Sequence, residues 1–184
     1  MAERNGKQLN AVVEGFDTNG LDESVLDTVR ELTIQLVRNA VVHGIESPQQ
    51  RIAHNKPAEG LLNLSLSEPV AGAMELSIED DGNGIDYEAI RRKAATLPTF
   101  AHEDVSTWDR QKILMAMFTS GLSTMNGENE DAGRGVGMDV IRNRIHALGG
   151  KLQVATRAQQ YTRFVIRFPS DPATAMANNS SRQS

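Results

Sequence analysis

The central stretch of the chain, residues 74–84, reads MELSIEDDGNG. Met74, Leu76 and Ile78 alternate with polar residues, which predicts a strand with one apolar and one polar face. The strand ends at Asp80 and runs into a turn rich in glycine. A carboxylate fixed by a buried strand, beside glycines that let a ligand approach the backbone, is typical of a binding site. A plain strand-end turn is the alternative, because Asp-Gly and Asn-Gly are common turn pairs.

The bulk composition indicates one soluble domain. The chain has 184 residues, of which 39% are hydrophobic and 23% charged, so it can bury a core of its own. A net charge of −5 argues against non-specific nucleic-acid binding. The absence of cysteine excludes disulfides and thiolate sites. No apolar run approaches the length of a membrane span or a signal peptide, so we expect a cytoplasmic domain without membrane contact.

Helical and alternating apolar spacings define the other elements. Before the opening stretch, we expect a strand at 9–14, a helix at 24–42 ended by Gly44, a short helix after Pro48, a strand at 62–66 and a turn at 69–72. After it, we expect a helix capped by Asp86 and reaching residue 95, an irregular segment at 97–107, a helix at 108–118, a loop or lid at 119–135, a helix at 136–148 and strands at 151–156 and 163–168.

These elements predict an α+β fold. The strands are half apolar and pair in sequence before and after the lid, which favours one mixed, mostly antiparallel sheet with helices on one face. The result is a two-layer sandwich over residues 1–170. Residues 171–184 are rich in Ala, Asn and Ser, and we expect a disordered tail there.

The long helix carries a polar stripe beside its apolar one. Gln35, Asn39 and His43 are spaced by four residues. Asn has poor helix propensity, and its amide oxygen is a suitable ligand for magnesium. A solvated helix edge is the alternative.

Two further segments have features of an anion site. Residues 133–138 (GRGVGM) lead into a helix, whose first backbone amides attract anions and whose glycines allow close approach. The pattern is neither a Walker loop nor a good dinucleotide fingerprint, and a flexible linker is the alternative. Residues 118–124 (FTSGLST) offer hydroxyls that could donate to phosphate, with a helix C-terminal turn as the alternative.

Together and in order, these motifs resemble the ATP-binding domain of the gyrase, heat-shock chaperone, histidine kinase and MutL superfamily. They are most similar to the catalytic domain of CheA-type chemotaxis histidine kinases. The matching segments are 36–46 (LVRNAVVHGIE, the N-box), 80–86 (DDGNGID, the first glycine box), 118–124, 133–140 (GRGVGMDV, the second glycine box), 148–150 and 162–164. The resemblance spans roughly residues 5–169.

The resemblance implies a Bergerat-type fold that holds ATP and Mg²⁺ between the long helix and the lid. Asn39 would be the magnesium ligand, Asp80 the adenine partner, and His43 would lie near the phosphates, with Gln35 at the catalytic position one turn before Asn39. The other nucleotide-binding positions that it implies are Gly82, Gly84, Ile85, Lys93, Ser123, Thr124, Gly133, Arg134, Gly135, Val136, Gly137, Met138 and Thr162.

The implied activity is transfer of the γ-phosphoryl group of ATP to a histidine on a separate phosphotransfer domain, in cis or in trans, with a response regulator downstream. Dimerisation would use domains that this chain does not contain. We therefore expect the chain to be one domain of a longer protein.

Three features depart from the CheA pattern. Gln35 stands where such kinases usually carry histidine and where the hydrolysing branches carry glutamate; it cannot accept a proton, which argues against a robust ATPase. Residues 125–131 (MNGENED) are acidic where a lysine is usual, which should weaken triphosphate binding unless Arg134 compensates. Tyr161 replaces an expected glycine. The alternative function is therefore a weakened or non-catalytic nucleotide-binding module.

Overall fold

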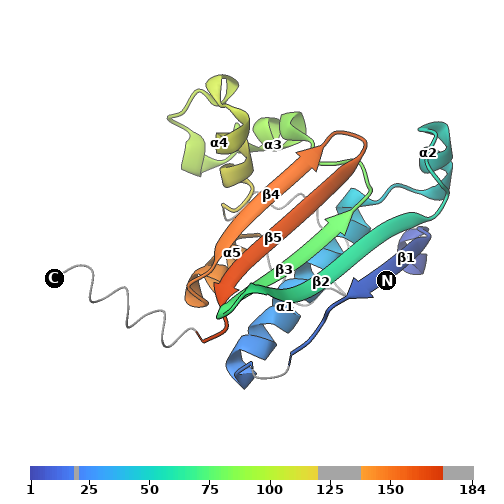
Figure 1. The fold of residues 1–184 in the computed structure, drawn as a ribbon. Helices are drawn as coiled ribbons and strands as arrows, with labels where there is room; N and C mark the ends of the chain where they lie inside the picture. The colour runs from blue at the N-terminus through green and yellow to red at the C-terminus, as the bar shows by residue number, and fades with distance from the viewer. Residues whose placement is uncertain (19–20, 120–137, 172–184) are drawn as a thin grey trace. The chain divides into compact units, whose positions relative to one another are not determined.

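The computed structural model describes residues 1–18, 21–119 and 138–171 (Figure 1). Its centre is a mixed sheet of five strands in the order β1-β2-β3-β5-β4. The strands are β1 Leu9–Glu14, β2 Gly60–Val70, β3 Ala73–Asp80, β4 Lys151–Arg157 and β5 Tyr161–Pro169. β1 runs parallel to β2, whereas the other three pairings are antiparallel. The predicted α+β fold with a mixed, mostly antiparallel sheet is confirmed.

The helices fall between the strands. They are α1 Glu23–Asn39, a π-helical turn Ala40–Gly44, α2 Pro48–Ala53, α3 Tyr87–Ala94, α4 Arg110–Ala116 and α5 Met138–Ala147, with single 3-10 turns at Glu3–Asn5, Pro98–Phe100 and Val105–Thr107. The chain divides into two compact units. The first contains residues 1–85 and the chain from Arg144 onward, and therefore the whole sheet; the second contains residues 86–143.

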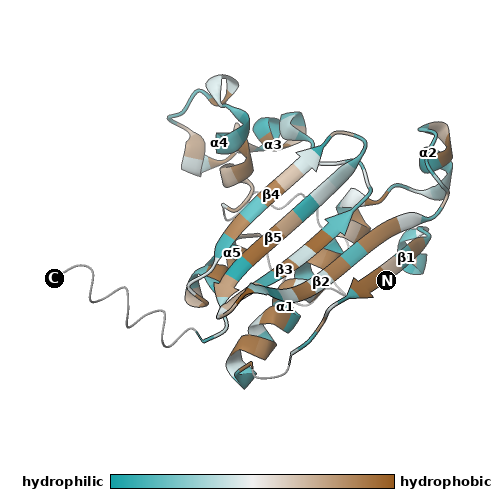
Figure 2. Cartoon of the chain, in the orientation of Figure 1, coloured by the Kyte–Doolittle hydropathy of each residue, from teal (hydrophilic) through white to brown (hydrophobic). Residues whose placement is uncertain are grey.

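α1 covers one face of the sheet in the first unit (Figure 1). Asp22 caps the helix by accepting a hydrogen bond from the Ser24 backbone N–H. The predicted apolar stripe is buried, and so are the side chains of the same face of β2, β3 and β5. Figure 2 shows the alternation of apolar and polar residues along these strands. The buried members are Val25, Val29, Leu32 and Leu36 of α1, Leu62, Leu64 and Leu66 of β2, Met74, Leu76 and Ile78 of β3, and Phe164, Ile166 and Phe168 of β5.

Two element boundaries differ from the sequence prediction. β2 continues through Pro69 to Val70, where we expected a turn; its register with β3 shifts between Ser67 and Val70, so a proline without an N–H fits there. The helix expected to run to residue 42 ends as α1 at Asn39, and the π-helical turn follows. The N–H of Ile45 donates to the carbonyl of Ala40, five residues earlier, at 2.8 Å.

The second unit packs around an aromatic pair. Trp108 is buried and meets Phe100 edge to face, with ring centroids 4.9 Å apart. Asp86 caps α3 as predicted, accepting from the N–H of Ala89. The helix expected at 108–118 is shorter and begins at Arg110. Asp109 caps it, because its side chain accepts a hydrogen bond from the backbone N–H of Lys112.

Candidate functional site

Asp80 ends β3 on the helix-covered face of the sheet. Only 4% of the residue is exposed. Thr162, also buried, lies directly opposite it on β5, so the structure brings together two of the predicted site residues. One oxygen of the Asp80 carboxylate accepts a hydrogen bond from the N–H of Gly82 at 3.0 Å.

Burial raises the pKa of the Asp80 carboxyl from its usual 3.8 to about 7. The Gly82 N–H and the ammonium of Lys56 oppose this shift, whereas the negative charges of Asp81 and Glu46 add to it. A buried carboxyl poised near neutrality in a strand-end turn is a candidate for ligand recognition. The ionised form would be stabilised by a further hydrogen-bond donor.

Glycines surround this carboxyl because side chains do not fit. A Cβ atom at Gly82 would lie 2.1 Å from the carbonyl oxygen of Gly44, and one at Gly44 would lie 2.7 Å from an Asp80 carboxylate oxygen. The N–H of Asn83 donates to the same Gly44 carbonyl at 2.9 Å. The end of the π-helical turn therefore packs directly against the turn that follows Asp80.

The last glycine of this turn needs its special backbone conformation. Gly84 has φ of +74°, and a Cβ there would lie 2.6 Å from the carbonyl oxygen of Arg157. The N–H of the next residue, Ile85, donates to the hydroxyl of Thr156 at 3.0 Å. The turn is thus fastened to the β4–β5 hairpin.

The three polar residues of the predicted stripe lie in two different elements. Gln35 and Asn39 lie one turn apart near the end of α1, and both are half-buried. His43 lies in the π-helical turn and is exposed. A π-helix has more residues per turn than an α-helix, so a spacing of four residues no longer places His43 in line with Gln35 and Asn39. Lys7 donates to the carbonyls of Val41 and Val42 at 2.6 and 2.8 Å, which satisfies backbone acceptors released at the helix end.

Asn39 offers one amide oxygen for a cation. Within the described ranges of the chain, no group of three or more His, Asp or Glu side chains is placed to hold a metal ion. Magnesium keeps several waters and commonly takes one or two protein ligands plus substrate phosphates. A single amide donor therefore fits a magnesium ion that is held mainly by phosphate oxygens.

The remaining predicted positions belong to the second unit or lie outside the described residues. Lys93, on α3, and Met138, the first residue of α5, belong to the second unit. Several predicted residues lie outside the described residues: Ser123, Thr124, Gly133, Arg134, Gly135, Val136 and Gly137. The described part of the site is therefore the half around Asp80.

A buried ionic cluster behind this turn escaped the sequence analysis. The guanidinium of Arg51 is fully buried and holds both carboxylate oxygens of Asp81, at 3.0 and 2.7 Å. It also donates to Glu46 at 3.1 Å, and Lys56 donates to the other oxygen of Glu46 at 2.7 Å. The acidic doublet Asp80-Asp81 was the available signal for this cluster. Two adjacent carboxylates repel each other unless one of them has a cation as partner; Asp80 faces the helix-covered side, and Asp81 faces Arg51.

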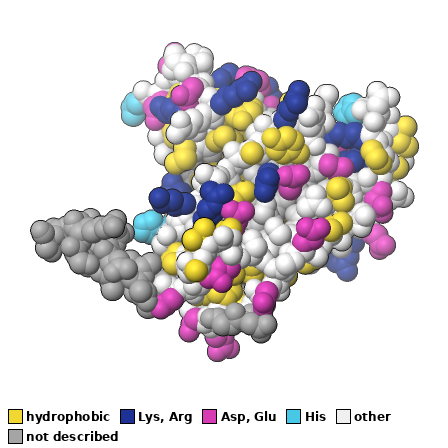
Figure 3. Space-filling model, in the orientation of Figure 1, with side chains coloured by type: hydrophobic (Ala, Val, Ile, Leu, Met, Phe, Trp, Pro, Cys, Tyr) yellow, Lys and Arg dark blue, Asp and Glu magenta, His cyan; other side chains and the backbone are white. Residues whose placement is uncertain are grey.

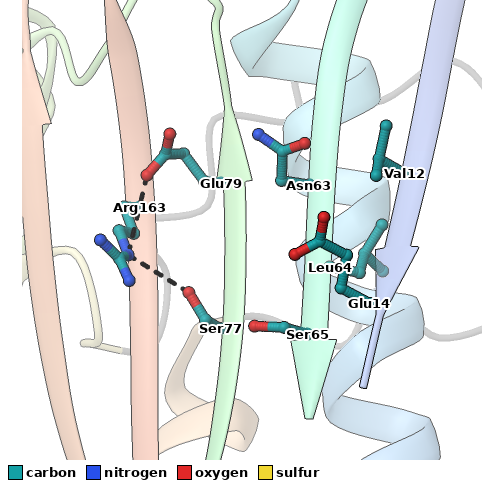
Figure 4. Close-up of a pocket in the computed structure, with 8 residues that line it drawn as sticks. All are labelled: Val12, Glu14, Asn63, Leu64, Ser65, Ser77, Glu79 and Arg163. Atoms are coloured by element: carbon teal, nitrogen blue, oxygen red, sulfur yellow. Dashed lines mark hydrogen bonds and ion pairs between the residues drawn. The ribbon is translucent and has the colours of Figure 1, made fainter. Parts of the chain in front are cut away.

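A polar groove of about 300 Å³ lies on the other face of the sheet. Figure 4 shows its side chains rising from β1, β2, β3 and β5, with Arg163 donating to Ser77 at 3.2 Å and paired with Glu79 at 3.7 Å. Charges of both signs are interspersed there (Figure 3), as on a solvated sheet face. Because residues 77 and 79 point to the opposite face from Asp80, this groove is not part of the candidate site. Its lining residues are Val12, Glu14, Asn63, Leu64, Ser65, Ser77, Glu79 and Arg163.

The model of one protein family matches residues 25–172, and that family is described as "Histidine kinase-, DNA gyrase B-, and HSP90-like ATPase". The chain is 34% identical to a gliding motility regulatory protein of Myxococcus xanthus over 174 residues, which are 94% of the chain and 22% of the relative. It is 36% identical to the chemotaxis protein CheA of Treponema pallidum over 163 residues, or 89% of the chain and 20% of the relative. The chain thus spans about a fifth of the length of these relatives.

Solved structures agree on the fold. The catalytic domain of the histidine kinase ThkA superposes with a TM-score of 0.53 at 17% identity, covering 94% of this chain and 84% of that domain. Full-length ShkA in complex with AMPPNP gives 0.51 at 18% identity, covering 91% of this chain and 26% of ShkA. Across residues 1–18, 21–119 and 138–171, no helix has the length and apolar character needed to cross a bilayer.

Proposed function

The chain belongs to the family of histidine kinase-, DNA gyrase B- and HSP90-like ATPases, and we propose that it is the ATP-binding catalytic domain of a CheA-type histidine kinase. The observation that carries this proposal is Asp80, a buried carboxyl at the end of a strand, enclosed by Gly44 and Gly82. The sequence identity of 34–36% with two CheA proteins, over 89–92% of the chain, supports the assignment to CheA-type kinases within this family.

Asp80 is the proposed adenine-recognition residue. Its carboxylate would accept a hydrogen bond from the exocyclic amine of adenine, whereas guanine presents a carbonyl oxygen at that position and would be repelled. Thr162, opposite Asp80 in the sheet, provides a hydroxyl at the same end. Gly82, Gly84 and Ile85 would supply the backbone beside the bound adenine.

The phosphate end is proposed from the N-box and the second glycine box. Asn39 would hold the magnesium ion, which supplies charge neutralisation at the phosphates when bound. Near it we place His43. The motif match adds Ser123 and Thr124 as hydroxyl donors to phosphate, and Lys93 as a further nucleotide-binding residue. The second glycine box would cradle the phosphates with backbone amides; it contains Gly133, Arg134, Gly135, Val136, Gly137 and Met138.

The proposed reaction is phosphoryl transfer. A ring nitrogen of a histidine on a phosphotransfer domain, in cis or in trans, forms a bond to the γ-phosphorus as the bond to the bridging oxygen of ADP breaks. The imidazole then loses its proton to solvent, and a response regulator takes the phosphoryl group in a later step. The imidazole nitrogen is already nucleophilic, so Gln35 need not act as a base. Binding and positioning therefore suffice for a slow transfer without a base at this position, whereas ATP hydrolysis would need a base to activate water.

A nucleotide-binding module without transfer activity is the second candidate. Gln35 and the acidic residues 125–131 favour it. Labelled ATP incubated with the chain and a histidine phosphotransfer domain of a CheA-type kinase separates the two functions. Label on the acceptor histidine supports the kinase; tight ATP binding without label on the acceptor supports the module.

The substitution Gln35→His tests whether Gln35 limits transfer. We expect a faster rate of label transfer, on the order of tenfold, because an imidazole can exchange a proton where the amide cannot. Gln35→Asn, which preserves the amide, is the matched control and should not raise the rate. An unchanged or slower rate for Gln35→His would show that Gln35 is not a deficit.

A further inference from the structure

We propose that Lys56 and Arg51 are positioning residues for the adenine site: they fix the carboxylate of Asp80 through the peptide group between Asp81 and Gly82. Neither side chain belongs to the motifs that identify the family, and neither is proposed to touch the nucleotide. The role in adenine recognition rests on the function proposed above, whereas the positioning of the carboxylate does not.

One planar peptide group connects the cations to Asp80. Its carbonyl oxygen, that of Asp81, accepts from Lys56 Nζ at 2.8 Å and from Arg51 Nη1 at 3.3 Å. Its N–H, that of Gly82, donates to the Asp80 carboxylate at 3.0 Å. Because the peptide is rigid and trans, holding the carbonyl fixes the direction of the N–H on its opposite edge.

The ammonium of Lys56 is fully engaged. It donates to the carbonyls of Asp81 and Gly82, both at 2.8 Å, and to Glu46 Oε1 at 2.7 Å. These three acceptors match its three N–H donors. Two successive carbonyls therefore converge on one cation, an arrangement that permits little rotation of the turn.

Arg51 anchors the same turn to the sheet. Beside its two bonds to the Asp81 carboxylate, its Nε donates to the carbonyl of Pro57 at 2.7 Å. Asp81 also accepts from the backbone N–H of Leu61 in β2 at 2.9 Å. A buried cation is tolerated only when its donors are satisfied, so the cluster specifies one geometry for the turn.

Loss of this clamp should affect adenine recognition selectively. Without Lys56, the Gly82 N–H is released and the Asp80 carboxylate can turn away from the direction in which the adenine amine donates. The positive charge of Lys56 also favours the ionised carboxylate, which is the accepting form. The proposed magnesium ligand, Asn39, lies on α1 and not in this turn.

The first test compares ADP with inosine diphosphate, which has a carbonyl oxygen in place of the adenine amine. In Lys56→Met, we expect ADP affinity to fall about tenfold, the effect of one charge-assisted hydrogen bond, while inosine diphosphate affinity stays within about twofold. Lys7→Met is the matched control: Lys7 is also half-buried and donates to two backbone carbonyls, so its loss should leave the ratio unchanged. A ratio of the two affinities that is unchanged in Lys56→Met, whether both fall equally or neither falls, would overturn the proposal.

The second test needs no nucleotide. In the wild-type chain, the NMR chemical shift of the Gly82 amide proton should change with pH as Asp80 titrates. Asp80→Asn should remove this change, which shows that it arises from Asp80 and not from the neighbouring Glu46, Asp81 or Lys56. In Lys56→Met, we expect the amplitude of the transition to fall by at least half. An unchanged amplitude would contradict the positioning role. If neither diphosphate binds the wild-type chain, the proposed function fails while this titration still decides the positioning.

A conservative variant keeps the test decisive if Lys56→Met does not fold. Lys56→Arg preserves the cation and several donors, so it should keep most of the ADP preference and the Gly82 titration. Lys56→Gln, with two amide N–H donors in place of three and no charge, should give intermediate values for both. A Gln variant equal to wild type in both measurements would overturn the proposal.

Discussion

At the scale of single residues, Asp80 is subject to two opposing effects. Burial favours its protonated form, whereas recognition of an amine needs the ionised one. With a pKa of about 7, the carboxyl changes state near neutral pH. Both nucleotide affinity and folding stability should therefore depend on pH, in opposite directions.

Nucleotide affinity should rise with pH. About one unit below the pKa, only about a tenth of Asp80 is ionised, so ADP should bind about tenfold more weakly at pH 6 than on the plateau above pH 8. Calorimetric titrations across this range measure the effect. Inosine diphosphate carries the same titrating phosphates, so the ratio of the two affinities isolates Asp80. A ratio that does not change with pH would exclude Asp80 as the adenine acceptor.

Folding stability should show the opposite sign. Because the pKa of Asp80 is raised from 3.8 to about 7 by folding, its contribution is complete below about pH 4 and is lost as pH rises through 7. Asp80→Asn keeps an oxygen that can accept from Gly82, so at pH 8 it should increase the free energy of unfolding by on the order of 2 kcal/mol. The gain should shrink at pH 5. Urea denaturation at both pH values checks this, and a loss of stability at pH 8 would contradict it.

At the scale of elements, Gly84 and Gly72 offer a matched comparison. Their φ angles are +74° and +78°, but a Cβ at Gly84 meets the Arg157 backbone at 2.6 Å whereas one at Gly72 meets nothing within 4 Å. Gly72→Ala should cost about 1 kcal/mol for the left-handed conformation alone. Gly84→Ala should cost on the order of 1–3 kcal/mol more, because the turn must move away from the β4–β5 hairpin. Equal losses by thermal or urea unfolding would mean that the close approach is not required.

Sequence periodicity predicted the elements whose stability comes from a repeating apolar face. The stripe from Val25 to Leu36 and the alternation along β3 are properties of local spacing, and both are confirmed. The π-helical turn at Ala40–Gly44 was missed, because it depends on where Gly44 packs against Asp80 rather than on spacing. β2 likewise passes Pro69 because a shift in register accommodates it.

At the scale of the whole molecule, motifs located residues that meet across the sheet, but not those that support them. Asp80 and Thr162 were assigned separately and turn out to be direct neighbours. Arg51 and Lys56 reach Asp81 from α2 and the segment after it, and Glu46 pairs with both cations, a meeting that no spacing rule encodes. The family match covers residues 25–172, and the phosphate-side motifs within it remain predictions.

The preference of the chain for ATP over GTP, measured with magnesium, tests whether Asp80 recognises adenine. In isothermal titration calorimetry of the 184-residue chain with magnesium, we predict saturable binding of ATP. GTP should bind at least about tenfold more weakly, because guanine has a carbonyl oxygen in place of the amine that donates a hydrogen bond to Asp80. Asp80→Asn should reduce the affinity for ATP to a similar degree. Equal affinities for ATP and GTP, or an affinity for ATP that is unchanged in Asp80→Asn, would show that Asp80 does not recognise the adenine base.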